Sequence, residues 1–146
     1  MPCPYTFLTM LITYATSLDN LSADHLRGGF FAGWPNPPTP ETHLRLLRGS
    51  AYVVLARESE ADNVIGYITA ISDGVLAAYI PQLEVLPAYR GQGIGSELVR
   101  RMLAQLQHIY MIDLICEADV QPFYERLGLT RYTGMIQRNY ERQSGD

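Results

Sequence analysis

The chain has 146 residues, of which 47% are hydrophobic and 18% charged, and its formal net charge at pH 7 is −4. This length and composition predict one domain spanning residues 1–146, with a substantial apolar core. Because the chain is acidic and all 11 of its Lys and Arg residues are arginines, we expect no nucleic-acid partner. Any anionic ligand must instead be bound locally, by backbone amides or a few arginines.

The start of the chain, "MPCPYTFLTMLITY", lacks a basic segment and is interrupted by Pro, Tyr and Thr, so it does not predict a signal peptide. No stretch approaches the roughly 18 apolar residues of a membrane span. Cys3 and Cys116 are far apart, and His25, His43 and His108 lack ligand spacing. We therefore expect a cytoplasmic protein without membrane contact, disulfide or metal, whose histidines lie on the surface or on a helix face.

The first third of the chain predicts a strand, two helices and a stiff loop. Residues 7–14 mix Thr, Ile and aromatic residues, as strands do. Ser22 can cap a short helix that a glycine pair ends. Four prolines within residues 35–40 exclude helix and central strand there, and Thr39 followed by proline then predicts a helix over 40–47.

The remainder alternates between strand and helix patterns. We expect strands at 51–57, 64–71, 75–86 and 111–116, helices at 94–109 and 119–127, and short final strands at 129–132 and 134–139. Residues 51–57 and 64–71 read as a hairpin, and Pro81 predicts a bulge in its strand. Asp119 can cap the last helix. The order predicts a mixed α/β fold.

The stretch "YRGQGIGSE" places three glycines at the start of a helix. It could be an ordinary turn and cap. A dinucleotide fingerprint fits less well, because the spacing is G-x-G-x-G rather than G-x-G-x-x-G. The third interpretation is a pyrophosphate cradle, in which the amides from Gly91 to Ser96 and the positive end of the helix face one anion.

Two segments carry a resemblance to a known family. "LEVLPAYRGQGIGSELVRRML" resembles the cofactor-binding motif of the GNAT superfamily of acyl-CoA-dependent N-acetyltransferases, with Arg90, Gly93 and Gly95 at the positions of [RQ]-x-x-G-x-[GA]. "LEVLP" matches the preceding L-x-V-x-P pattern. Downstream, "PFYERLGL" resembles F-Y-x-x-x-G-F, with Leu129 in place of phenylalanine. The resemblance covers residues 50–132.

The resemblance implies the GNAT fold: a mixed central sheet of about six to seven strands between flanking helices. The strands at 75–86 and 111–116 would splay apart, with the cofactor-binding core at 50–132 and residues 20–49 facing the acceptor. The co-substrate would be acetyl-CoA. Backbone groups of Leu83 and Val85 would bind its pantetheine arm and acyl carbonyl. The pyrophosphate would lie against the run Arg90, Gly91, Gln92, Gly93, Ile94, Gly95 and Ser96.

The resemblance also implies catalytic roles. Tyr124 matches the tyrosine that protonates the leaving thiolate. Glu84, on the bulged strand, is the first candidate for the base, with Tyr79, Gln82 and Glu117 as rivals; strand alternation alone would turn Glu84 away from its neighbours' face. Relatives commonly carry asparagine, which contacts the cofactor, where this chain has Glu117, so the chain departs from the family pattern there.

The acceptor would be a primary amine of a small molecule, a peptide or a protein, attacked directly in a ternary complex. Phe30, Phe31 and Trp34, with Tyr79, could wall its pocket, and an aromatic wall near Glu84 would suit a cationic amine. The aromatic residues could equally seal the small helices onto the sheet. A different class of function is a binding module that keeps the acyl-CoA cradle but transfers little. We expect a monomer or a homodimer, the latter paired through the C-terminal strands.

Overall fold

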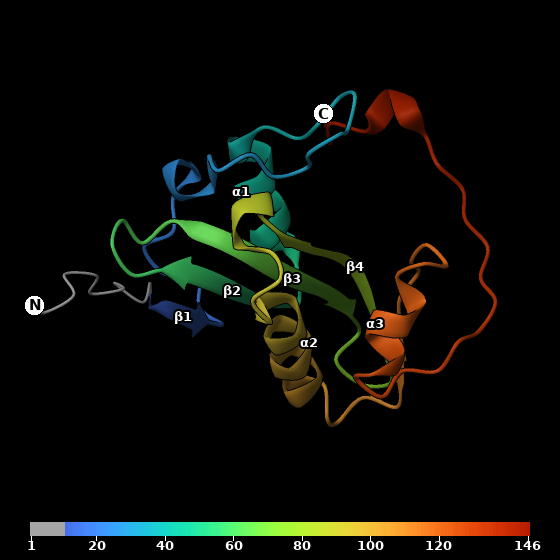
Figure 1. The fold of residues 1–146 in the computed structure, drawn as a ribbon. Helices are drawn as coiled ribbons and strands as arrows, with labels where there is room; N and C mark the ends of the chain where they lie inside the picture. Colours follow the sequence, from blue (N-terminus) through green and yellow to red (C-terminus); the bar gives the residue numbers. More distant parts are fainter. Residues whose placement is uncertain (1–10) are drawn as a thin grey trace, which may run out of the picture.

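Five strands form one mixed sheet in the order β1-β2-β3-β4-β5, in a computed structural model that describes residues 11–146 (Figure 1). They are β1 (Ile12–Ala15), β2 (Tyr52–Glu58), β3 (Val64–Ser72), β4 (Ala77–Val85) and β5 (Met111–Asp113). The first four pair antiparallel, and β5 pairs parallel to β4. The predicted α/β class and the β2–β3 hairpin are confirmed.

The helices are η1 (Ala23–Leu26), α1 (Pro40–Gly49), η2 (Pro87–Tyr89), α2 (Ile94–Gln105), α3 (Gln121–Glu125) and η3 (Tyr140–Arg142). The predicted start of α1 is confirmed: the Thr42 N–H donates to Thr39 Oγ1 at 3.1 Å, and Pro40 occupies the first turn. Proline fits there because its missing N–H would have had no partner within the helix. No helix in residues 11–146 has the length and apolar character needed to cross a membrane.

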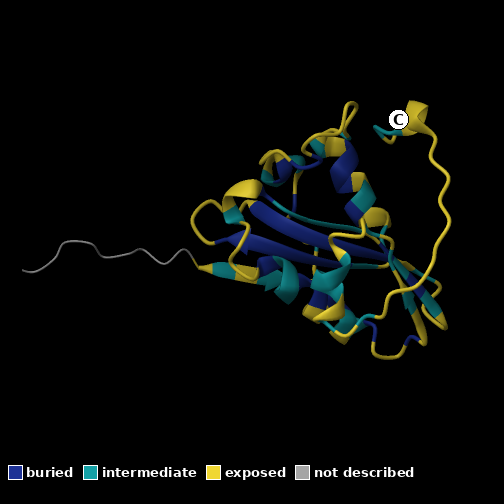
Figure 2. Ribbon diagram, turned by 45° about the vertical axis from the view of Figure 1, so that its right-hand side comes forward, coloured by how far each residue is buried: buried dark blue, intermediate teal, exposed yellow. Residues whose placement is uncertain are grey.

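The helices α1 and α2 cover opposite faces of the sheet. On β3, the Tyr67 ring lies 4.5 Å from the His43 ring of α1, whereas a Cβ added to the adjacent Gly66 would lie 3.2 Å from Leu98 of α2. Successive side chains on a strand point to opposite faces, which explains this division. Figure 2 shows the buried sheet between exposed loops. The apolar face predicted for α2 is confirmed, since Leu98 and Met102 are fully buried.

Strand β4 is irregular on both of its edges. Its pairing with β3 shifts register so that Ile80 and Pro81 lie opposite Ala70 alone, which is the bulge that Pro81 predicted. On the other edge only residues 77–79 pair with β5. From Ile80 to Val85 that edge of β4 has no strand beside it within residues 11–146, so β4 and β5 splay apart.

The sheet has five strands in the described residues, so the predicted count of about six to seven is wrong. The expected strands at 129–132 and 134–139 are absent because this stretch has no strand partner there and is almost entirely exposed. Strand β5 ends at Asp113, and the pattern at 7–14 yields β1 only from Ile12; residues 7–10 lie outside the described residues. The predicted cap Asp119 is also wrong, since α3 begins after Val120 without a side-chain cap.

The C-terminal segment leaves α3, passes along the outside of the molecule and returns to α1 (Figure 1). Tyr132 is 92% exposed and Met135 96% exposed along this path. At its end, Asp146 pairs with Arg45 of α1 at 3.3 Å, and Gln143 Oε1 accepts the Asn36 N–H at 3.0 Å. The last residues are thus bound next to the proline-rich loop.

Candidate active site

The glycine-rich turn enters α2 with its amides unpaired. Gly91 and Gly93 have φ values of +77° and +82°, and Gly93 is the N-cap of α2 without any side-chain cap bond. Left-handed backbone of this kind favours glycine, and a Cβ added to either residue would meet nothing within 4 Å. Conformation, not packing, therefore requires these two glycines. The first intrahelical bond is Glu97 N–H to the Gly93 carbonyl, which leaves the amides of Ile94, Gly95 and Ser96 without an acceptor in the helix.

Gly95 has a different role from the other two. Its backbone φ is ordinary, and an added Cβ would lie 3.6 Å from the Phe123 ring of α3. This glycine lets α3 pack beside the first turn of α2. The run of amides and the positive helix end together suit an anion such as a pyrophosphate, without any lysine.

The open edge of β4 presents backbone groups to the gap between the splayed strands. The Leu86 N–H donates to the Ile65 carbonyl at 2.8 Å, which sets the alternation along this antiparallel pair. Glu84 therefore turns its backbone groups toward β3, and Leu83 and Val85 turn theirs toward the gap. The alternation of the strand therefore leaves the backbone groups of Leu83 and Val85 facing the gap, as their predicted role requires.

Arg90 connects the turn to this strand. Its Nε–H donates to the Val85 carbonyl at 2.9 Å, so this carbonyl already has a partner and the Val85 N–H is the group left facing the gap. The Arg90 side chain is otherwise exposed. The residue that the sequence motif places in the cofactor site therefore also fixes the geometry between β4 and the glycines.

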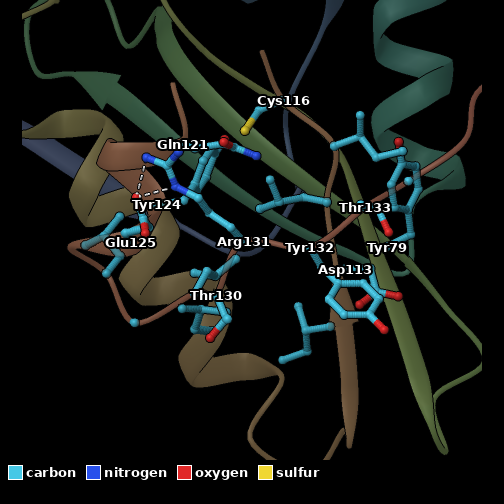
Figure 3. A pocket seen from close by; sticks show the side chains of 18 of the residues that line it. Tyr79, Asp113, Cys116, Gln121, Tyr124, Glu125, Thr130, Arg131, Tyr132 and Thr133 are labelled. Atoms are coloured by element: carbon cyan, nitrogen blue, oxygen red, sulfur yellow. Dashed lines mark hydrogen bonds and ion pairs between the residues drawn. The ribbon is translucent and has the colours of Figure 1, made fainter. Parts of the chain in front are cut away.

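Tyr124, on α3, lines a pocket of about 900 Å³ between α3, β5 and residues 129–134 (Figure 3). Tyr79 and Cys116 line the same pocket, and the Arg131–Glu125 ion pair, 2.7 Å long, lies at one side of it. Burial, and then the nearby Cys116 thiol, raise the pKa of Tyr124 to about 12. The phenol therefore stays protonated at neutral pH and suits a proton donor, not a base.

The structure gives the candidate bases different surroundings. Both carboxylate oxygens of Glu84 accept the Phe31 backbone N–H, at 3.0 and 2.9 Å. Gln82 accepts a hydrogen bond from the Tyr67 hydroxyl at 3.2 Å, and Glu117 is exposed on the loop after β5. Glu84 is thus on the α1 face and engaged with the loop. It does not line the pocket that contains Tyr124.

The predicted acceptor residues do not form one wall. Phe30 and Phe31 are buried in the core, whereas Trp34 is 42% exposed and stacks at a tilt 5.0 Å from Phe31. Tyr79 lies apart from these three residues, in the large pocket. The two phenylalanines therefore pack the small helices onto the sheet.

His43 lies in the core, whereas the sequence predicted all three histidines on the surface or on a helix face. It is 1% exposed and packs among Phe30, Phe31 and Tyr67, with ring centroids 5.2, 4.9 and 4.5 Å away. Its place one turn before the buried Leu47 was the available signal. Among the described residues no cluster of histidine, cysteine and carboxylate side chains suits a metal ion.

Two comparisons with known proteins cover two thirds or more of the chain. It is 53% identical to an inferred acetyltransferase from Deinococcus radiodurans R1 of known crystal structure, with a TM-score of 0.87 over 91% of this chain and 92% of that one. It is 28% identical over 102 residues to the uncharacterised N-acetyltransferase ycf52 of Pyropia yezoensis, a match that covers 68% of this chain. The chain spans about three fifths of that relative, 59% of its length.

A more distant likeness concerns the fold. The aminoglycoside N-acetyltransferase AAC(6')-Iy, crystallised in complex with CoA, is 16% identical, with a TM-score of 0.64 over 89% of this chain and 95% of that one. The profile of the acetyltransferase (GNAT) family matches residues 20–129, which include the glycine-rich turn, the splayed strands and Tyr124. The chain therefore belongs to the GNAT acetyltransferase family, whose members use acetyl-CoA or CoA.

Proposed function

We propose that this protein transfers an acetyl group from acetyl-CoA to a primary amine by direct attack in a ternary complex. The observation that carries the proposal is the combination of an uncapped, glycine-rich start of α2 with the splayed edge of β4. The start of α2 suits an anion, and the edge of β4 suits an extended arm. These match the pyrophosphate and the pantetheine arm of a CoA thioester.

The residues of this chain fit such a donor. The amides of residues 91–96 would hold the pyrophosphate, and the absence of side chains at Gly91 and Gly93 lets the backbone approach it closely. The Val85 N–H, aimed into the gap, would stabilise the oxyanion that forms when the amine attacks the thioester carbonyl. A single donor of this kind contributes about 3 kcal/mol to transition-state stabilisation in comparable sites.

Tyr124 would then complete the transfer. As the carbon–sulfur bond breaks, the phenol donates its proton to the leaving thiolate, and its raised pKa keeps that proton available. The attacking amine must lose a proton before or during attack. Glu84 would accept it only after loosening from the Phe31 N–H, so we expect solvent to take part in this step.

The acceptor class proposed is a small amine or a peptide or protein amino group, in a cytoplasmic setting. We also propose a homodimer built on residues 129–139. This stretch has the composition of a strand but no strand partner among the described residues. It exposes Tyr132, Met135 and Ile136 next to the outer edge of β5, which pairs with no other strand in residues 11–146. A second copy could cover both.

Two measurements test the enzyme. The first is CoA binding by calorimetry, and the second is release of free thiol from acetyl-CoA with a panel of amines and peptides. Tyr124→Phe should lower kcat about 100-fold with little change in KM for acetyl-CoA. The matched control is Tyr14→Phe, on β1 outside the pocket. CoA binding with no acceptor turned over would instead support the binding module, and failure to bind CoA would refute both.

A further inference from the structure

The large pocket that contains Tyr124 begins where β4 and β5 separate. Tyr79 of β4 and Asp113 of β5 form the last pair of these two parallel strands, and both line the pocket. Its volume of about 900 Å³ is in the range of small-molecule sites. A molecule bound there would lie at the inner end of the gap proposed for the acyl arm, in the same pocket as the proposed proton donor.

The pocket has walls from both faces of the sheet. Tyr79 pairs with Ile71 of β3, which lies an even number of residues from Tyr67 and so points to the same α1 face. Tyr79 and its partner Asp113 therefore point to that face as well. Leu103 of α2, which covers the opposite face, lines the same pocket. An acceptor can thus lie against the α1 face and still reach the gap.

Asp113 is the unpaired charge of this pocket. Three charged residues line the pocket, and two of them, Arg131 and Glu125, pair with each other at 2.7 Å. In Figure 3 Asp113 lies apart from this pair. Within residues 11–146 its carboxylate has neither an ion pair nor a side-chain hydrogen bond. The pocket therefore presents one carboxylate that no arginine of the described chain neutralises.

The surroundings of this carboxylate also favour a cation. Tyr79 and Tyr110 line the same pocket, and the face of a phenol ring attracts a cation within about 6 Å. Burial, and then Glu117 and Asp119, raise the pKa of Cys116, another lining residue, as expected where the nearby charges are mainly negative. A cationic group would thus be attracted here and an anionic group repelled.

We propose that this pocket binds an acceptor amine carrying a second cationic group, and that the Asp113 carboxylate accepts the hydrogen bonds of that group. The α,ω-diamines are the class with this chemistry: one ammonium would pair with Asp113 while the other nitrogen, deprotonated, attacks the thioester. The inference rests on the proposed function, because it names the acceptor class. It places recognition at Asp113 and not at Glu84, whose carboxylate accepts the Phe31 N–H.

Binding can be measured without any transfer, because CoA without an acetyl group cannot react. Calorimetry on the protein, with and without saturating CoA, compares putrescine with 4-amino-1-butanol, which has a hydroxyl in place of the second ammonium. We expect putrescine to bind about three- to tenfold more tightly at low salt. Asp113→Asn should abolish this preference. The matched control Asp19→Asn removes the same charge at an exposed residue that does not line this pocket, and it should retain the preference.

Salt gives a second measurement that needs only the wild type. Raising NaCl from about 20 mM to about 0.5 M screens a partly exposed ion pair, so the preference for putrescine should fall toward equal binding. The affinity for 4-amino-1-butanol, which makes no such pair with its hydroxyl, should change less. This comparison stands even where the Asp113→Asn variant fails to fold.

Three results would overturn the proposal: equal binding of the two ligands by the wild type, a preference that Asp113→Asn retains, or a preference that salt leaves unchanged. Preferential putrescine binding with no thiol release from acetyl-CoA would support the pocket while refuting the proposed transfer. Thiol release with monoamines, without any preference for the diamine, would do the opposite.

Discussion

Replacing His43 by phenylalanine should stabilise the folded protein, and the gain should grow as the pH falls. The substitution keeps a flat ring among Phe30, Phe31 and Tyr67 while it removes Nε2, which is buried without a hydrogen-bond partner among the described residues. If this position served packing alone, an imidazole would offer no advantage over a phenyl ring. The variant therefore measures how much the histidine lowers the free energy of unfolding.

The magnitude has two parts. An unsatisfied buried polar atom costs about 1–3 kcal/mol, part of which a slightly larger ring would offset by crowding, so we expect a gain of about 1 kcal/mol at pH 7. The second part depends on pH. The folded ring has a pKa of about 4 and stays neutral where the unfolded ring, at 6.5, takes up a proton.

The unfolded state thus binds more protons between pH 6.5 and 4, and the wild-type free energy of unfolding falls as the pH falls through that window. A depression of this size corresponds to at most about 3 kcal/mol, reached at pH 4, and to about 2 kcal/mol at pH 5. His43→Phe removes this loss. Tyr67, whose ring packs against His43, is the same in both proteins, so its contribution largely cancels in the comparison.

Urea unfolding of the wild type and the variant at several pH values between 4 and 7.5 measures both parts. The two curves of free energy against pH should lie about 1 kcal/mol apart and parallel near neutral pH, and should diverge below pH 6. His108→Phe should follow the wild type, because that histidine is exposed and bonded to Tyr52. A variant that is less stable than the wild type at pH 7 and parallel to it at lower pH would show that Nε2 is satisfied, and the reasoning would be refuted.

Three further changes test other parts of the structure. Gly93→Ala should cost about 1 kcal/mol in thermal unfolding and weaken CoA binding in calorimetry, because its φ is +82°, whereas Gly49→Ala, with ordinary backbone and no neighbour within 4 Å, should do neither. Glu84→Gln should destabilise the protein by about 1–2 kcal/mol in urea, since it weakens a charge-assisted bond to the Phe31 N–H; an unchanged midpoint would argue against this contact in solution. Met135→Asp should halve the molar mass measured by light scattering, and an unaltered mass would count against the proposed dimer surface.

Local sequence signals predicted the elements whose geometry is set within a few residues. Thr39 and the following proline fix the start of α1 because the cap and the ring act on the adjacent turn. Pro81 likewise predicted the bulge in β4. In each case the backbone itself carries the constraint, so the residue type alone is informative.

Contacts between distant segments were beyond the sequence. The bond from Glu84 to the Phe31 N–H joins residues 53 positions apart, and its formation depends on how η1 and its loop settle on β4. The burial of His43 depends in the same way on the rings that β3 and the loop bring to it. The final strand patterns, between 129 and 139, had the right residue types, but a strand exists only where a neighbouring edge accepts its hydrogen bonds.

The bond from Arg90 to the Val85 carbonyl has a consequence for donor selection. Together with the Tyr89 N–H to Leu86 and Arg90 N–H to Pro87 bonds, 2.9 and 3.3 Å long, it makes residues 85–90 a stiff spacer between the open edge of β4 and the glycine-rich turn. A stiff spacer fixes the distance between the open edge of β4 and the glycine-rich turn. It would admit a thioester whose arm has the length of pantetheine, and a shorter thioester anchored by the same amides would stop short of the Val85 N–H.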